Sequence, residues 1–136
     1  MALELVKDTR CFACGDDNPH GLHLTVEKDG EHGVKAQFIA VEKYRGWSNF
    51  LHGGVISLIF DELLGWTTRH AGYDAMTARL EIRYRNPVPL GTTVNFKAEL
   101  ERNVKGLLDI RLTARMEDGP VVAEGKGRMM IIKRRQ

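Results

Sequence analysis

Residues 51–66 form an almost continuous apolar stretch, and its spacing predicts a helix over 53–70. No polar stripe on this helix is wide enough to face water, so the pattern predicts a helix buried on all sides. Asp61 and Glu62 nevertheless lie in its middle. Because burying an unpaired carboxylate is costly, this conflict between burial and charge directs the search for function to the helix.

Alternating apolar and polar positions predict strands on both sides of this helix. Two such segments precede it, and they cover 22–27 and 34–39, with a turn at 28–33 and a loop at 41–50. Four follow it, and they cover 77–85, 93–102, 107–116 and 121–133. The short linkers between the last three are rich in turn residues, which is typical of antiparallel hairpins.

One helix cannot cover both faces of a six-stranded sheet. The economical arrangement is an α+β fold in which an antiparallel sheet curls around one long central helix. With 136 residues, the chain has the usual size of one domain. We expect a single domain over 1–136, with an N-terminal extension and loop at 1–21 and a core at about 22–132.

Composition excludes several classes of partner. A net charge of +2, from 20 basic and 18 acidic residues, offers no case for binding nucleic acid or an anionic membrane surface. The longest apolar run, 55–60, is far shorter than the roughly 20 residues that span a bilayer. The N-terminus lacks the pattern of a secretory signal, so a cytoplasmic location is expected.

The turn formed by His52, Gly53 and Gly54 leads directly into the predicted helix. The first N–H groups of a helix lack acceptors and lie at its positive end, where a carbonyl or an oxyanion binds favourably. The alternative is that the glycines only make a tight turn, and spacing alone does not separate the two interpretations.

Asp61 follows Gly53 by eight residues, which is about 12 Å along a helix axis. One carbonyl therefore cannot touch both groups within one subunit. Either only one group acts, or a symmetric dimer with antiparallel helices assembles the site from two chains. The structural alternative for Asp61 is a loop cap or an ion pair with Arg79 or Arg83. Glu62 points about 100° away, and we expect it to bind a donor or reach the rim.

Together these motifs resemble the hotdog-fold acyl-CoA thioesterases of the PaaI-like, phenylacetate-pathway branch. His52, Gly53, Gly54 and Asp61 match the HGG-x6-D pattern of that family, and residues 11–22 and 77–91 are also similar. The resemblance extends over about residues 20–132. It implies an acyl-CoA thioesterase that needs no cofactor and forms a homodimer or a dimer of dimers.

The resemblance also assigns roles. Asp61 would activate water or attack the thioester, the Gly53 N–H would polarise the carbonyl, and Thr77 would position the water. His52 would order the loop rather than act as a base. Gly46 stands where relatives often carry Asn, so another polar group would have to replace it. The expected substrate-binding residues are Ser48, Asn49, Gly54, Arg83 and Arg85, although arginines on an alternating strand also fit a solvated face.

The N-terminal loop contains a C-x2-C-x5-H-x2-H pattern made by Cys11, Cys14, His20 and His23. Four such ligands suit zinc, but the second spacing is tighter than in zinc fingers. The favoured interpretation is therefore two reduced cysteines that pack the loop, with no metal. Two other functions fit the fold, namely a non-catalytic acyl-CoA binder or sensor and a hydratase or dehydratase. The latter needs a catalytic His paired with an acid, which this sequence does not offer.

Overall fold

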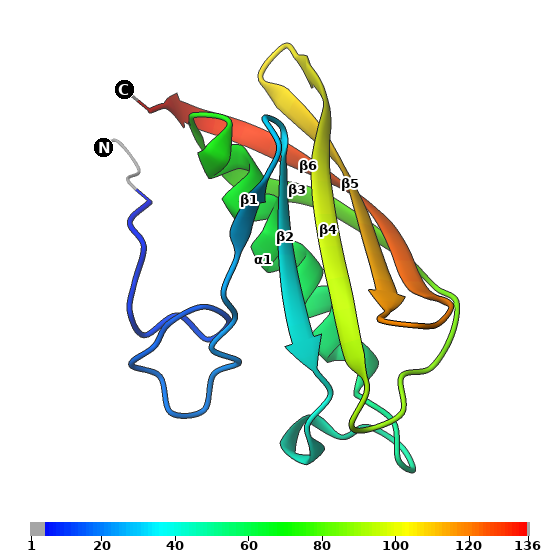
Figure 1. The fold of residues 1–136 in the computed structure, drawn as a ribbon. Coiled ribbons are helices and arrows are strands. Elements are labelled where there is room, and N and C mark those ends of the chain that lie inside the picture. The colour runs from blue at the N-terminus through cyan, green and yellow to red at the C-terminus, as the bar shows by residue number, and fades with distance from the viewer. Residues whose placement is uncertain (1–4, 136) are drawn as a thin grey trace.

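The computed structural model describes residues 5–135 and confirms the predicted α+β fold, in which six antiparallel strands accompany one long helix (Figure 1). In chain order the elements are β1 (Glu27–Asp29), β2 (Gly33–Ile39), the short 3-10 helix η1 (Glu42–Tyr44), α1 (Gly53–His70), β3 (Tyr73–Tyr84), β4 (Thr93–Val104), β5 (Leu107–Met116) and β6 (Val121–Arg134). No helix within residues 5–135 has the length and apolar character required to span a membrane.

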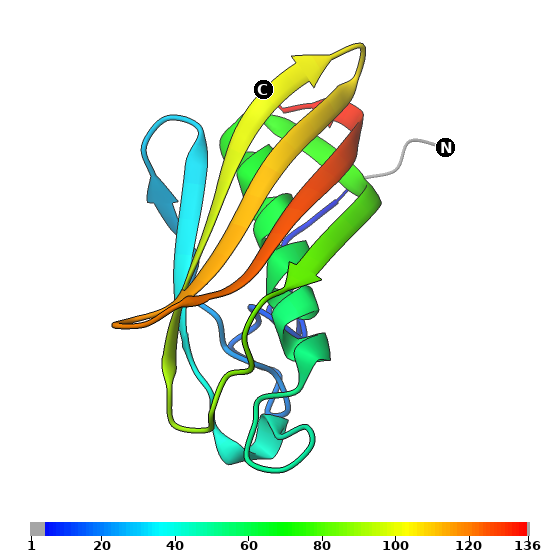
Figure 2. The same ribbon diagram turned by 90° about the vertical axis from the view of Figure 1, so that its right-hand side faces the viewer.

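The strands lie in the order β1-β2-β4-β5-β6-β3, so β1 and β3 form the two edges of the sheet. Helix α1 runs lengthwise along one face, and the curved sheet wraps around it (Figure 2). The fully buried helix residues Phe60 and Leu64 face the sheet. The rings of Phe60 and Phe96 meet edge to face, with their centroids 5.7 Å apart. A Cβ at Gly127 of β6 would collide with Leu64, so this glycine permits the close packing of helix on sheet.

Helix α1 begins and ends at the predicted residues, and β5 also has its predicted bounds. The strand predicted over 22–27 is wrong, because only Glu27 belongs to β1. The backbone N–H groups of Leu22 and Leu24 donate instead to Phe12 and Ala13 in the N-terminal segment. His23 between them has a left-handed φ of 52°, which interrupts an extended strand. The predicted turn at 28–33 is correspondingly shorter.

The prediction that α1 is buried on all sides is also wrong for the single chain. The sheet covers one side of the helix, and the N-terminal segment contacts a second side through Cys11 and Glu62. Asp61 lies on a third side and is exposed, and its helix neighbours Ser57 and Leu58 are only half-buried. Within residues 5–135 of one protomer, no layer therefore covers this side of the helix.

Candidate active site

His52 is the N-cap of α1. Its side-chain Nδ1 accepts a hydrogen bond from the Gly54 N–H at 2.8 Å, and its carbonyl accepts one from the Val55 N–H at 3.0 Å. Its own N–H donates to the Tyr44 carbonyl at 2.9 Å. Since Nδ1 accepts a hydrogen bond, that nitrogen carries no proton and is already engaged. The side chain thus orders the turn, which is the contact expected from the sequence.

Replacing His52 with alanine is expected to lower the free energy of unfolding by about 1 kcal/mol, because it removes the acceptor for the Gly54 N–H. An asparagine at position 52 supplies another side-chain acceptor and should recover most of the loss. Urea denaturation of both variants and the wild type measures the difference. Equal stability of the alanine variant and the wild type would contradict the capping role.

The N–H of Gly53 is the first of α1, and no acceptor among residues 5–135 reaches it. The next two N–H groups are both satisfied by His52. The Gly53 carbonyl accepts a hydrogen bond from the Tyr84 hydroxyl at 3.1 Å, which ties the start of the helix to β3. The structure therefore leaves one donor, at the positive end of the helix, free to bind an incoming oxygen atom.

Asp61 and Thr77 form the second part of the site. The Thr77 hydroxyl donates to Asp61 Oδ1 at 2.8 Å, and both side chains are exposed. The structural alternative for Asp61, an ion pair with Arg79 or Arg83, does not form within residues 5–135, where Arg79 instead pairs with Glu81 at 3.2 Å. The second carboxylate oxygen, Oδ2, has no hydrogen bond to residues 5–135, so it remains available to water or substrate.

A β-bulge in β3 brings Thr77 and Tyr84 to the same face. Thr77 pairs with Met129 and Arg79 pairs with Arg128, which leaves Ala78 without a partner on β6. Strict alternation, as the sequence pattern indicates, would place positions 77 and 84 on opposite faces. The inserted residue reverses the alternation, so that Thr77 reaches Asp61 and Tyr84 reaches Gly53. Tyr84 was missed by sequence reasoning, although it shares the inward spacing of Leu80 and Ile82.

Ser48 and Asn49 occupy the loop before α1. One guanidinium nitrogen of Arg45 donates to the Ser48 carbonyl at 2.7 Å and to the Asn49 side-chain oxygen at 3.1 Å. A Cβ at Gly46 would lie 3.0 Å from the Cα of His52, so a larger side chain would require the loop to shift. Position 46, where the family that this chain resembles often carries Asn, thus lies where the loop packs closely against the turn. Gly54 is exposed, and its N–H is engaged by His52.

Arg83 and Arg85 lie on the sheet face that turns away from α1. Arg83 pairs in register with Glu124, and Arg85 forms an ion pair with the same Glu124 at 2.9 Å. A Cβ at the next residue of β6, Gly125, would lie 3.4 Å from the ring of Phe60. Position 125 therefore faces α1, and Glu124 points to the opposite face. A single chain therefore does not bring either arginine to Asp61, and their assignment to substrate binding stays a prediction.

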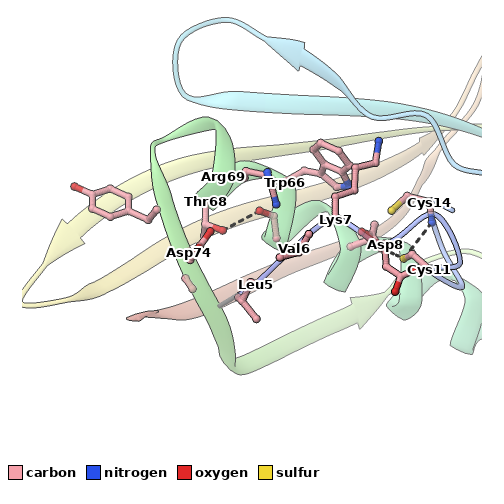
Figure 3. Close-up of a pocket in the computed structure, with 14 residues that line it drawn as sticks. Leu5, Val6, Lys7, Asp8, Cys11, Cys14, Trp66, Thr68, Arg69 and Asp74 are labelled. Atoms are coloured by element: carbon pink, nitrogen blue, oxygen red, sulfur yellow. Dashed lines mark hydrogen bonds between the residues drawn. The ribbon is translucent and has the colours of Figure 1, made fainter. Parts of the chain in front are cut away.

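Cys11, Cys14 and Glu62 line a cavity of about 300 Å³ between the N-terminal segment and the second half of α1, and their ligand atoms lie within 4.8 Å of one another. Figure 3 shows the two cysteines at one end of this cavity. Cys11 Sγ donates to Glu62 Oε2 at 3.5 Å. Burial, a hydrogen bond with Cys11 and the nearby Glu62 charge raise the pKa of the Cys14 thiol to about 12. The four-residue zinc set is wrong in its histidines, because within residues 5–135 the ligand cluster contains Glu62 and neither His20 nor His23.

Residues 48–123 match the family described as the thioesterase superfamily. A stretch of 57 residues is 35% identical to acyl-coenzyme A thioesterase THEM4 of Xenopus laevis, and it covers 42% of this chain and 26% of the relative. The chain thus aligns with about a quarter of that curated protein's length.

Two solved structures share the fold. A hypothetical thioesterase of Streptococcus pneumoniae with coenzyme A has a TM-score of 0.78 at 18% identity, covering 83% of this chain and 88% of its own. The PaaI protein of the E. coli phenylacetic acid degradation operon has a TM-score of 0.78 at 16% identity. This match covers 84% of the present chain and 83% of PaaI. The pneumococcal protein has also been solved as two alanine variants, one at an Asp and one at a Thr sixteen positions later.

Proposed function

Because the chain belongs to the thioesterase superfamily, we propose that it hydrolyses an acyl-CoA or aryl-CoA thioester to the free acid and coenzyme A. The observation that carries the proposal is the pairing of an exposed carboxylate, Asp61, with the Thr77 hydroxyl. These two residues have the same spacing as the Asp and Thr replaced in the pneumococcal variants. The coenzyme A in that pneumococcal structure and the activity named for the Xenopus relative support the same substrate class.

The site is completed across a symmetric dimer. In one chain the free Gly53 N–H and Asp61 are eight residues apart on one helix, about 12 Å along its axis. A thioester carbonyl is too small to bridge that distance. If two α1 helices pack antiparallel, the helix start of each protomer approaches the carboxylate of its partner, and two identical sites result.

The uncovered side of α1 supports this arrangement. Gly54, Ser57 and Gly65 share it with Asp61, and a Cβ at Gly65 would meet no atom of residues 5–135 within 4 Å. Glycine inside a helix costs about 1 kcal/mol relative to alanine, and the packing of the described residues gives no reason for a glycine at position 65. Close approach of a partner helix would supply that reason.

The free edge of β3 supports the same dimer. This strand has twelve residues, ends the sheet on one side and is exposed at four successive positions, 76–79. Natural proteins seldom leave so long an edge without a partner, because its backbone groups would pair with other chains. Antiparallel pairing of two β3 strands would extend the sheet across the dimer and bring both α1 helices together.

The chemistry then follows from the available donors and acceptors. The Gly53 N–H of one protomer binds the thioester oxygen and stabilises the negative charge that develops when the carbonyl carbon is attacked. The partner's Asp61 uses Oδ2 to accept the proton of the attacking water, or attacks the carbon itself, while Thr77 holds Oδ1. Collapse of the tetrahedral intermediate breaks the carbon–sulfur bond, and the coenzyme A thiolate leaves and takes up a proton from Asp61 or from solvent. Where Asp61 is the nucleophile, water then hydrolyses the acyl–Asp61 anhydride, which releases the free acid and restores the carboxylate.

A panel of acyl-CoA thioesters with short, medium and aromatic acyl groups tests the function, with release of free thiol as the readout. We expect steady turnover of at least one class. Saturable binding without thiol release across the panel would instead identify the chain as a binder or sensor on the same fold. Neither binding nor turnover would contradict the assignment of the substrate class.

A further inference from the structure

The cluster of Cys11, Cys14 and Glu62 has no part in the proposed hydrolysis. Glu62 follows Asp61 in the helix and therefore points about 100° away from it, toward the N-terminal segment. Among residues 5–135, Glu62 forms no ion pair with a basic side chain and accepts a hydrogen bond from the Cys11 thiol. A half-buried carboxylate placed beside two thiols rather than an amine or guanidinium is an unusual arrangement for a purely structural contact.

The positions of the ligand atoms fit a small cation. One ligand atom from each of the three residues lies within 4.8 Å of the other two. Zinc binds sulfur at about 2.3 Å and carboxylate oxygen at about 2.0–2.2 Å, so two such ligands at a tetrahedral angle are about 3.5 Å apart. Cys11 Sγ and Glu62 Oε2 are separated by that distance, 3.5 Å.

The backbone of the loop supports the thiol positions. The Cys14 N–H donates to Cys11 Sγ at 3.4 Å, and such a donor stabilises the charge of a thiolate. The Gly15 N–H donates to the Cys11 carbonyl at 2.9 Å, which closes the turn that carries both cysteines. A Cβ at Gly15 would overlap the backbone of Cys11, so only glycine allows this tight turn. The two thiols are thus held side by side, as Figure 3 shows.

We propose that Cys11, Cys14 and Glu62 bind one zinc-type divalent cation, with a water molecule from the adjacent cavity as the fourth ligand. Two thiolates and a carboxylate favour a borderline ion such as Zn²⁺ over the hard ions Mg²⁺ and Ca²⁺, which prefer oxygen ligands alone. The bound ion would fasten the N-terminal loop to the middle of α1, because the ligands come from segments 51 residues apart. The cation site and the thioester site are independent in this account.

Titration of the reduced full-length protein with Co²⁺ tests the proposal directly. Tetrahedral cobalt with thiolate ligands gives intense near-ultraviolet charge-transfer bands and visible bands that neutral thiols cannot produce. We expect one Co²⁺ per chain, displaced by Zn²⁺. Cys14→Ser should abolish the charge-transfer bands, and Glu62→Gln should weaken cobalt binding by at least tenfold. The double variant His20→Ala/His23→Ala is the matched control and should bind as the wild type does.

Three results would overturn the proposal. The absence of cobalt–thiolate bands in the reduced wild type would leave only a hydrogen bond between thiol and carboxylate. Unchanged affinity in a folded Glu62→Gln variant would remove the carboxylate from the site. Loss of binding in the double histidine variant would assign the ligands to His20 and His23 instead. Circular dichroism of each variant, measured without metal, separates lost ligation from lost folding, and none of these readouts depends on thioester turnover.

Discussion

Replacing Asp61 with asparagine is expected to lower kcat for thioester hydrolysis by about 100- to 10,000-fold, the usual contribution of a positioned proton acceptor. Asparagine has nearly the same shape, and its side-chain oxygen still accepts the Thr77 hydrogen bond seen at 2.8 Å. What it lacks is the ability to take a proton from water or to attack the carbonyl. Because Asp61 is exposed in the single chain, the loss should fall on turnover rather than on folding.

Thiol release from the best acyl-CoA substrate measures this effect, with KM determined in parallel. Asp118→Asn is the matched control, since it removes the same charge from an exposed position in the turn between β5 and β6. A retained kcat in the Asp61→Asn variant would exclude this carboxylate from the chemistry. A change confined to KM would point to substrate binding instead.

Replacing Gly53 with proline is expected to lower kcat by about 100- to 1,000-fold, the cost of removing one donor to the oxyanion. Proline deletes the N–H and is well tolerated at the first position of a helix, where that N–H has no partner within the helix. The preceding residue, His52, already has φ −63° and ψ 131°, the conformation that a following proline requires. Helix α1 should therefore persist while the proposed donor disappears.

Gly53→Ala is the matched control for the added atoms. A Cβ at this position would lie 3.6 Å from the Tyr84 ring, which is ordinary van der Waals contact, and the N–H is retained. We expect the alanine variant to keep its kcat within about tenfold of the wild type. Equal loss in the two variants would show that crowding at the turn, not the missing donor, is responsible. Thermal melts of both confirm that the fold is intact.

The parts of the fold that were predicted correctly depend on local patterns. The helix over 53–70 follows from a continuous apolar stretch that starts at a glycine turn and ends before Gly72. The hairpins follow from alternation and turn residues, and the family resemblance is confirmed by the match over residues 48–123. Such signals lie within the segment they describe, so a single sequence is enough to find them.

The errors arise where distant segments decide the structure. Leu22 and Leu24 alternate as in a strand, yet their N–H groups bond to the N-terminal segment rather than to the sheet. The bulge at Ala78 reflects the register between β3 and β6, which no local pattern in β3 reveals. The expectation of a helix buried on all sides describes α1 only if a second protomer covers the side that carries Asp61.

The candidate site residues likewise divide into those with a local sequence signal and those brought together from distant segments. The position of His52 at the start of the helix and of Asp61 in its middle follows from spacing along one segment. Their proposed roles come from the family resemblance and stay predictions. Tyr84 was missed because its contact with Gly53 spans 31 positions. Likewise, proximity in sequence suggested His20 and His23 as partners of the cysteines, whereas folding brings Glu62 to them from 51 positions away.

The central claim, that each site combines Asp61 of one protomer with Gly53 of its partner, is tested by mixing two inactive variants. Asp61→Asn and Gly53→Pro chains with different affinity tags are co-expressed, and the heterodimers are purified through both tags. A shared site predicts about half of the wild-type activity, because one of the two sites then contains both intact residues. Heterodimers no more active than either variant alone would contradict the account, since a site within one chain would be defective in every protomer.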